Sequence, residues 1–417
     1  MDKYTVGNMN KIYLFLYTLC VLLTGYLHIG SLSIRVIATL LAAVFLIFSN
    51  LLKETSFWAD GKSKCYMQMY FCFSVVMGFS LLINGDFEEY DFIKRFLGYY
   101  MVCIITYMYL GVSLKDISTI NLLINTLIFV VIIDSLVSIL QFLGNFWGWT
   151  LGNYLGADIT RYVDRAERYS SDELSMMANI PGIMGSVVGN SFFIMSVAPL
   201  CLYKALSTKK VLCKILLYGC SLLCFIACFA VQERFAFFVL LLNYLALFYF
   251  RMNRHKGVFI SILVIVLIFA FSNINPNSDF LGRLSFSSYT SNSDRDGFIS
   301  RAVDFIFDHL LFGGPVQFEK INFGLSTHNF FFDSFIAAGL LGAIILLWLF
   351  CKILVVPIKV ILQHLRKGKV LSLEIAVSLC LIASLLQGFF HNNSLLTGEV
   401  LIWILFIILL KIKTIKE

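Results

Sequence analysis

Charged side chains are scarce in this sequence. Asp, Glu, Lys and Arg make up 14% of the 417 residues, against roughly 25% in a typical soluble domain. So few charges cannot cover the surface of a soluble protein in which 59% of the residues are hydrophobic and 41 are Phe. The composition therefore excludes a soluble enzyme, a disordered chain and a nucleic-acid-binding domain. The net charge of +7 is accounted for by positive-inside membrane loops.

Other patterns are missing as well. No alternating ten-residue strand pattern is present, so we expect a helical membrane protein. The sequence has no phosphate-binding glycine loop, HExxH pair, nucleophile elbow or DxD metal site. We therefore expect chemistry without a metal or a cofactor, in which Arg takes the place of a divalent cation. The eleven cysteines lie almost entirely in apolar runs, and we interpret them as packing residues.

Long apolar runs dominate the chain. A membrane-spanning helix needs about 20 apolar residues, and the runs predict an all-α polytopic membrane protein in which residues 1–417 form one integral membrane domain. Twelve spans are predicted, at 11–27, 32–52, 65–84, 92–112, 119–141, 190–206, 211–231, 235–250, 257–274, 330–351, 371–390 and 395–411.

The positions of Lys and Arg predict the orientation. With a cytoplasmic N-terminus, 21 of the 32 Lys and Arg fall on the cytoplasmic side. Twelve spans then place the C-terminus in the cytoplasm too. The outer side holds eight of these residues, and all of them except Lys320 are Arg. Arg binds phosphate and carboxylate in a planar, bidentate way, so outer arginines indicate an anionic ligand on that side.

Two predicted outer loops are long, at 142–189 and 275–329, and loops of this length are usually functional or disordered. In the first, Trp147 and Trp149 are interpreted either as an interfacial aromatic belt or as platforms for sugar rings. The three arginines that follow are candidates for binding acidic sugars or an acceptor pyrophosphate; they are Arg161, Arg165 and Arg168.

The second loop contains a predicted amphipathic helix on the outer membrane surface. Apolar residues recur at helical spacing from Phe298 to Leu311, and the segment Gly313–Pro315 is predicted to end the helix. Arg295 and Arg301 lie at its start.

Polar residues at the predicted outer mouths of spans are the remaining candidates. His328 and His391 each begin a His-Asn pair. A neutral His is the best general base near pH 7, but a single interfacial His is more often a structural hydrogen-bonder. Arg234 is costly at such a place unless paired or functional, and a local pair with Glu233 is the simpler interpretation. Asp134, inside a span, is interpreted as a structural hydrogen-bonder.

These residues form a pattern that resembles the O-antigen ligase and polymerase superfamily. His328-Asn329, nine residues, Gly339, two residues and Gly342 is similar to that family's His-Asn-x9-Gly-x-x-Gly signature. The run from Arg295 to LLFGG (310–314) resembles its arginine, amphipathic helix and "PLFG" element. Arg234 in QERFAFF and the IPGIMGSVVGN stretch (180–190) resemble two further family elements.

The resemblance implies a GT-C-like, metal-independent glycosyltransferase of the bacterial inner membrane, with a periplasmic active site. The donor is an oligosaccharide on undecaprenyl pyrophosphate, and a chain-length regulator protein is a further partner. Carried onto this chain, it assigns catalytic roles to His328, Arg234 and Arg295 and substrate binding to Arg301 and Asn329.

We predict an O-antigen polymerase, which moves the growing glycan onto the next lipid-linked repeat unit in lipopolysaccharide biosynthesis. The alternatives are a ligase that transfers the glycan to lipid A–core, and a transporter or flippase for the same lipid. Transporters favour inverted repeats and charges near the midplane, whereas no repeat is visible here and the outer arginines gather at one mouth.

Overall fold

The structure is a computed structural model that describes residues 3–23, 28–29, 32–51, 61–155, 180–231, 233–251, 293–322, 327–368, 371–391 and 393–416. The predicted span at 257–274 lies outside these residues, and so do the stretches 156–179 and 275–292 of the two predicted outer loops.

Each of the other eleven predicted spans lies largely on helix. These helices are α1 (Lys3–Leu22), α2 (Ile34–Leu51), α3 (Gly61–Asn84), α4 (Phe92–Arg95) continued by the π-helix η1 (Phe96–Tyr100) and α5 (Met101–Ser113), α6 (Ile117–Phe142), α10 (Val187–Ser207), α11 (Val211–Val231), α12 (Arg234–Arg251), α17 (Phe330–Arg366), α18 (Leu373–Gln387) and α19 (Val400–Lys416). Within the described ranges, seven helices are long and apolar enough to cross a membrane. The helical fold class is confirmed, and these helices indicate a membrane-embedded protein.

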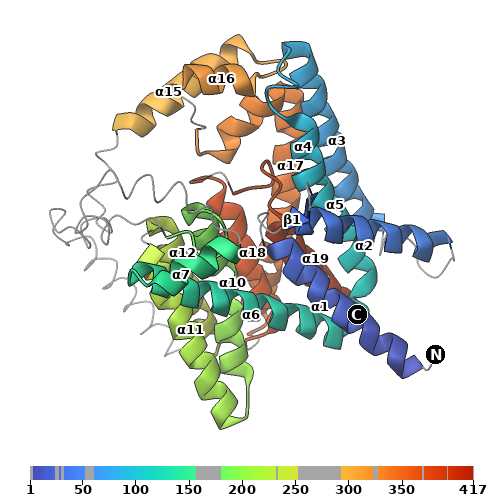
Figure 1. Cartoon of the computed structure of the whole chain (residues 1–417), viewed down its shortest axis with the longest axis vertical. Helices are drawn as coiled ribbons and strands as arrows, with labels where there is room; N and C mark the ends of the chain where they lie inside the picture. Colours follow the sequence, from blue (N-terminus) through green and yellow to red (C-terminus); the bar gives the residue numbers. More distant parts are fainter. Residues whose placement is uncertain are drawn as a thin grey trace.

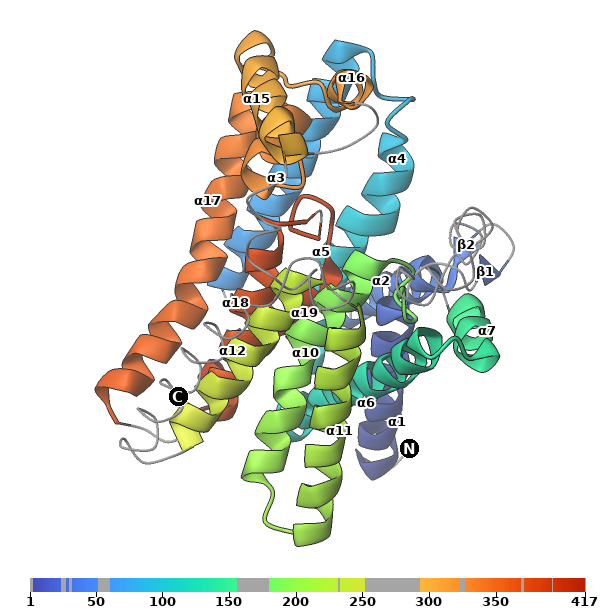
Figure 2. The same ribbon diagram turned by 90° about the vertical axis from the view of Figure 1, so that its left-hand side faces the viewer.

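The helices surround two largely buried ones. α10 packs against α6, α11, α12 and α18, and α19 packs against α5 and α18. Residues 400–409 of α19 are all buried or nearly so. α3 runs beside α17, and the short helices α15 (Ser293–Asp308) and α16 (Pro315–Ile321) cover the upper ends of this pair (Figures 1 and 2). Both termini lie in the lower half of both views.

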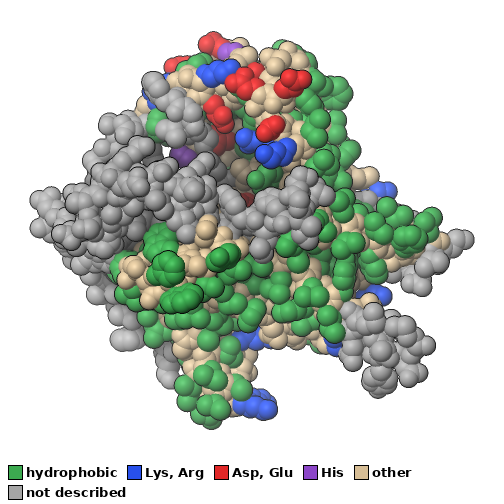
Figure 3. All heavy atoms as spheres, in the orientation of Figure 1, with side chains coloured by type: hydrophobic (Ala, Val, Ile, Leu, Met, Phe, Trp, Pro, Cys, Tyr) green, Lys and Arg blue, Asp and Glu red, His purple; other side chains and the backbone are tan. Residues whose placement is uncertain are grey.

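Charge and apolar surface are separated along the long axis. Figure 3 shows Asp, Glu, Lys and Arg gathered at the upper end, around α15, α16 and α4, and hydrophobic side chains across the middle. Lys and Arg reappear at the lower end. A belt of apolar side chains between two polar ends is the surface that a bilayer requires of a spanning protein.

The predicted amphipathic helix is confirmed as α15, although it ends at Asp308 and a turn follows over residues 309–312. Part of its apolar face does not point to lipid. Ala302 and Phe305 pack against Phe318 of α16 and Ile336 of α17. Phe307 remains exposed. Pro315, which was predicted to end this helix, instead begins α16.

The segment after the first long loop folds back into the bundle, and Asp134 holds it there. Asp134 Oδ1 accepts a hydrogen bond from the Ile183 backbone N–H at 2.8 Å. Gln141 both donates to and accepts from the Gly182 backbone, and the Asn190 side chain donates to the Ile180 carbonyl. The prediction that Asp134 is a structural hydrogen-bonder is therefore confirmed. Buried backbone groups outside helices need such partners.

Two predicted boundaries were wrong. α17 continues to Arg366 rather than ending near 351, because its last turns keep an apolar face while Lys and Arg occupy the other. The last span begins at Val400 rather than 395, because residues 393–399 form a loop. Two small features complete the fold: a hairpin of β1 (His28–Ile29) and β2 (Leu32–Ser33), and helix α7 (Phe146–Leu155).

Candidate functional site

Three chain segments meet where α12 and α17 begin and α18 ends. The Phe330 backbone N–H, at the first turn of α17, donates to the Gly388 carbonyl just after α18 at 2.7 Å. The Asn329 side chain caps α17 by accepting from the Phe331 N–H at 3.0 Å, which is the usual role of Asn at this position. The predicted His-Asn pair is thus at a helix start, pinned to the neighbouring helix end.

His328 has a constrained backbone. Its φ angle is 55°, a left-handed conformation that is uncommon for residues other than glycine and that often marks functional sites. The preceding Thr327 is held by Asp333, whose Oδ1 accepts from the Thr327 hydroxyl at 2.6 Å and from its N–H at 3.1 Å. The turn that presents His328 is therefore fixed from both sides.

His391 lies opposite His328 and is paired with a carboxylate. Its Nε2 is 2.8 Å from Oε1 of Glu233, and both side chains are mostly buried (17% and 12% exposed). Since a carboxylate only accepts hydrogen bonds, this contact assigns the proton to Nε2 and leaves Nδ1 as the acceptor of the neutral ring. The ring centres of His328 and His391 are 6.4 Å apart.

Glu233 also begins α12. Its carboxylate accepts from the Ala236 N–H at 2.6 Å and from the Phe235 N–H at 3.3 Å, as a negative group at a helix N-terminus should. Arg234 follows it as the first residue of α12. The sequence suggested a local pair between Glu233 and Arg234; in the structure the Glu233 carboxylate lies against His391, which is 158 residues away. We call Glu233, Arg234, His328 and His391 the histidine cluster.

The LLFGG segment and the Gly339 motif, far apart in sequence, interlock through their backbones. The Gly314 N–H donates to the Ile336 carbonyl at 2.8 Å, and the Leu340 N–H donates to the Leu310 carbonyl at 2.7 Å. α17 is broken here, because Ala338 and Gly339 leave helical geometry. We call residues 310–314 together with the break at 338–340 the glycine clasp.

Helix α3 fixes the other side of the clasp. Ser80 Oγ donates to the Phe312 carbonyl, and Asn84 Nδ2 donates to the Gly313 carbonyl at 3.2 Å. Gly342 faces the same helix: a Cβ added to it would lie 3.6 Å from Val76 and 3.7 Å from Phe73. The expectation that these glycines allow close packing is confirmed at Gly339, where a Cβ would meet the LLFGG backbone; at Gly342 a Cβ would make only ordinary contact with α3.

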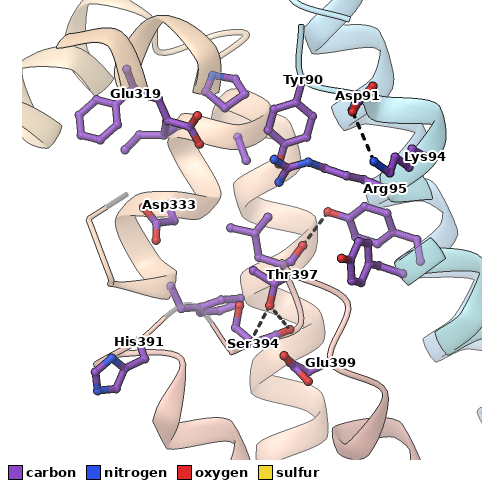
Figure 4. Close-up of a pocket in the computed structure, with 18 of the residues that line it drawn as sticks. Tyr90, Asp91, Lys94, Arg95, Glu319, Asp333, His391, Ser394, Thr397 and Glu399 are labelled. Atoms are coloured by element: carbon purple, nitrogen blue, oxygen red, sulfur yellow. Dashed lines mark hydrogen bonds and ion pairs between the residues drawn. The ribbon is translucent and has the colours of Figure 1, made fainter. Parts of the chain in front are cut away.

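A cavity of about 550 Å³ adjoins the histidine cluster, within the range of small-molecule sites. It is bounded by the loop before α4, by α4 and η1, by α16, by the first turns of α17 and by the loop 391–399. We call it the upper cavity. Figure 4 shows Glu319 and Asp333 on one side, Tyr90 and Arg95 facing them, and His391 and Glu399 toward the bottom.

The floor of the upper cavity is irregular backbone held by side chains. The Tyr100 hydroxyl donates to the Leu396 carbonyl at 2.6 Å, and the Tyr70 hydroxyl donates to the Leu395 carbonyl at 2.8 Å. Non-helical backbone at membrane depth is tolerated where it is buried in protein or lines a cavity. Tyr100 comes from the π-helix η1, a geometry that is often found at functional sites. These donors explain why helix α19 begins five residues later than predicted.

The predicted site residues divide into three groups. Arg234, His328 and Asn329 lie at the meeting of α12, α17 and α18. Arg301 lies on α15, where its Nε donates to Asn322 Oδ1 at 2.9 Å and its guanidinium lies 5.1 Å from the Phe298 ring centre. The third group lies outside the described residues; it consists of Arg161, Arg165, Arg168 and the side chain of Arg295.

Sequence reasoning missed Glu233 and Arg95 as site residues and left His391 without a role. The signal for His391 was present, since it begins the second His-Asn pair at a span end. Its pairing with Glu233 depends on the packing of α12 against α18 and has no local signature. Comparison with protein-family models, with curated proteins and with solved structures gives no match to this chain.

Proposed function

We propose that this protein is a metal-independent glycosyltransferase of the inner membrane that polymerises a surface polysaccharide such as O-antigen. The growing glycan leaves undecaprenyl pyrophosphate and joins the next lipid-linked repeat unit at the periplasmic face. The proposal includes twelve spans in a GT-C-like arrangement, cytoplasmic termini and a chain-length regulator as a partner. The observation that carries it is the carboxylate-paired His391 facing His328 beside a cavity, in a helical membrane-embedded protein.

The histidine cluster supplies what glycosyl transfer needs. Nδ1 of His391 takes the proton from the acceptor hydroxyl, whose oxygen attacks the anomeric carbon of the donor. The bond from that carbon to the pyrophosphate oxygen breaks, and undecaprenyl pyrophosphate leaves with the electron pair. Glu233 stabilises the imidazolium and fixes its orientation, as carboxylates do in other His-dependent sites. The proton then passes from His391 to water.

Charge develops on the departing pyrophosphate, and Arg234 is the candidate to stabilise it. It is the first residue of α12, next to Glu233, so it adds a guanidinium to the positive end of a helix dipole. In the same proposal Arg295 and Arg301 of the α15 segment assist, and Arg161, Arg165 and Arg168 bind the acceptor pyrophosphate. His328 orients the acceptor or shares the role of base.

The test is an assay with the purified chain and a synthetic undecaprenyl pyrophosphate carrying one oligosaccharide repeat unit. We expect a ladder of longer lipid-linked glycans. Product that forms only after lipid A–core is added would identify the ligase instead. Accumulation of neither product would contradict the transferase proposal and favour the transporter.

The same assay separates the residues of the cluster. His391→Ala and His328→Ala should each lower the transfer rate, by about 10²–10⁴-fold for the residue that serves as base. Arg234→Ala should lower it by about 10²–10³-fold. A His328→Ala protein with unchanged rate and chain length would remove His328 from the mechanism.

The chain offers a matched control for His391. His364 forms a second buried histidine–carboxylate pair with Glu374, at 3.4 Å, near the end of α17 and the start of α18. It therefore lies at the opposite ends of the two helices that bracket the site. His364→Ala removes a comparable pair and should leave the transfer rate within a few-fold of the unmodified protein.

A further inference from the structure

The upper cavity has two kinds of wall. Aromatic faces come from Tyr90, Tyr99 and Phe318, and carboxylates come from Glu319, Asp333 and Glu399. Tyr90 is half-buried and carries the Arg95 guanidinium at 4.2 Å from its ring centre. Aromatic surface next to a few convergent polar groups is the usual lining of a small-molecule site. Carboxylate oxygens accept hydrogen bonds from hydroxyl groups, and such charge-assisted bonds are the strong ones.

The charges of the cavity do not balance. Two ion pairs neutralise part of the wall, because Lys94 lies 3.9 Å from Asp91 and Lys320 lies 2.8 Å from Glu89. Once these two ion pairs are set aside, the charged lining residues that remain are three carboxylates and the Arg95 cation. The carboxylates are those of Glu319, Asp333 and Glu399.

A second arginine, Arg35, lies next to Tyr99, with its guanidinium 5.7 Å from the ring centre. Burial raises the pKa of Glu399, and the Arg35 cation offsets part of this effect. Carboxylates still outnumber cations around this space. A negative group placed here would therefore be repelled at close range, where the surroundings screen charge less than water does.

The pKa of Tyr90 shows that Arg95, Glu319 and Asp333 lie close to its side chain. Burial raises the pKa of Tyr90, the Arg95 cation lowers it, and the Glu319 and Asp333 carboxylates raise it further. All three charged side chains thus act on one phenol of the cavity wall. A bound ring would lie against Tyr90 with carboxylates around its edge.

The upper cavity continues outward. An adjoining hollow of about 360 Å³ shares Glu89, Tyr90, Arg95 and Glu319 with it and is bounded further by Val316 and Lys320. At its inner side the cavity reaches His391. An elongated ligand could therefore fill both spaces and bring one end to the proposed base.

We propose that the upper cavity binds the acceptor glycan through an uncharged sugar, and that its carboxylates exclude sugars carrying a carboxylate or phosphate. This inference rests on the proposed function, since it places the acceptor hydroxyl near His391. It also separates the two substrates by charge. The arginines of the histidine cluster and of the outer segments bind the pyrophosphate, and the carboxylate-lined cavity binds the hydroxyl-rich sugar.

The test measures sugar binding directly, without transfer. Purified protein in lipid nanodiscs is titrated with neutral trisaccharides of glucose, galactose or N-acetylglucosamine, and with matched trisaccharides that end in glucuronic acid, and binding is followed by saturation-transfer NMR. We expect binding of at least one neutral trisaccharide and at least tenfold weaker binding of its glucuronic acid counterpart.

Variants of the cavity wall assign the binding to this place. Tyr90→Ala should weaken neutral-sugar binding on the order of tenfold, and Tyr90→Phe, which keeps the ring, should retain most of it. Glu319 is exposed, so Glu319→Gln should fold normally; it should reduce the discrimination against the acidic sugar several-fold. Tyr154→Ala is the control, because Tyr154 is an exposed aromatic residue on α7 away from the cavity lining.

Three results would overturn the proposal: acidic sugars binding as well as neutral ones, Tyr90→Ala and Glu319→Gln binding like the unmodified protein, or no neutral sugar binding at all. Its failure is distinguishable from failure of the proposed function. A glycan ladder that persists in both cavity variants refutes the subsite alone. Sugar binding that depends on Tyr90, in a protein that forms no glycan product, refutes the transferase and retains the subsite.

Discussion

The glycine clasp gives the sharpest test of the fold, through Gly339→Ala. Gly339 has φ 62° and ψ −166°, a region of backbone conformation that is essentially restricted to glycine. A Cβ at this position would meet the carbonyl oxygen and carbon of Leu311 and would lie 2.6 Å from the Phe312 nitrogen. These are backbone atoms that α3 holds in place through Ser80 and Asn84, so they cannot move aside cheaply.

The magnitude follows from two costs. The unfavourable backbone conformation costs about 1–3 kcal/mol, and overpacking against fixed atoms costs about 1–3 kcal/mol more. We therefore expect Gly339→Ala to lower the free energy of unfolding by about 2–6 kcal/mol. With an unfolding entropy of roughly 2 cal/mol/K per residue, this lowers the melting temperature of a chain of this length by about 2–7 °C.

The assay is thermal unfolding of the detergent-solubilised protein, followed by the loss of the monodisperse peak in size-exclusion chromatography. Gly219→Ala is the matched control, because a Cβ at Gly219 on α11 would meet no atom within 4 Å. Alanine in the interior of a helix is favoured over glycine by about 0.5–1 kcal/mol, so this variant should melt at or slightly above the temperature of the unmodified protein. If Gly339→Ala melts together with Gly219→Ala, the interlocked backbone of the clasp is refuted.

Two further predictions concern charged groups outside the spans. Asp116 caps α6 by accepting from the Thr119 N–H at 2.7 Å, and Asp116→Ala should cost about 0.5–2 kcal/mol in unfolding measurements. The same hydrogen bond lowers the pKa of Asp116 below its ordinary value of 3.8. The stabilisation that the ionised cap gives is therefore complete above pH 3.8 and is lost as the pH falls through the lowered pKa. Asp116→Asn should keep the cap and abolish this acid dependence. The Lys320–Glu89 pair is 63% and 55% exposed, so Glu89→Gln should leave the melting temperature almost unchanged, and a clear decrease would show that the pair is shielded from water.

Most of the helices could be predicted from the sequence because a bilayer imposes a simple requirement on each span. Runs of about 20 apolar residues identify them, since no water is present to satisfy an irregular backbone. The same logic failed at residues 395–399. Their composition is compatible with a span, but Tyr70 and Tyr100 supply the hydrogen bonds that a helix would otherwise provide, and those donors lie about 300 residues earlier in the chain.

The residues of the candidate site could be predicted from the sequence only where a local sequence pattern indicated them. His328 and Arg234 stood out because polar groups at the mouth of a span need an explanation. The amphipathic spacing of residues 298–311 also gave α15 correctly. The pairing of His391 with Glu233 and the docking of Gly313 against α17 are contacts between distant segments. They follow from how the helices are arranged, and no pattern within either segment indicates them.

The π-helix η1 makes the upper cavity sensitive to the length of the chain as well as to its side chains. A π-turn holds one residue more than the hydrogen-bonding pattern of an α-helix allows. Deleting a single residue between Phe96 and Tyr100 would restore a continuous α-helix through α4 and α5. Because the wide turn absorbs the extra residue, the helix on either side would keep its direction, and Tyr90, Lys94 and Arg95 would stay in the wall of the cavity. The deletion would instead remove the local widening at residues 96–100, which presents Tyr99 and Tyr100 to the cavity and lets Tyr100 reach the Leu396 carbonyl. A one-residue deletion at η1 is therefore a change that alters this part of the cavity wall alone, with the rest of the fold intact.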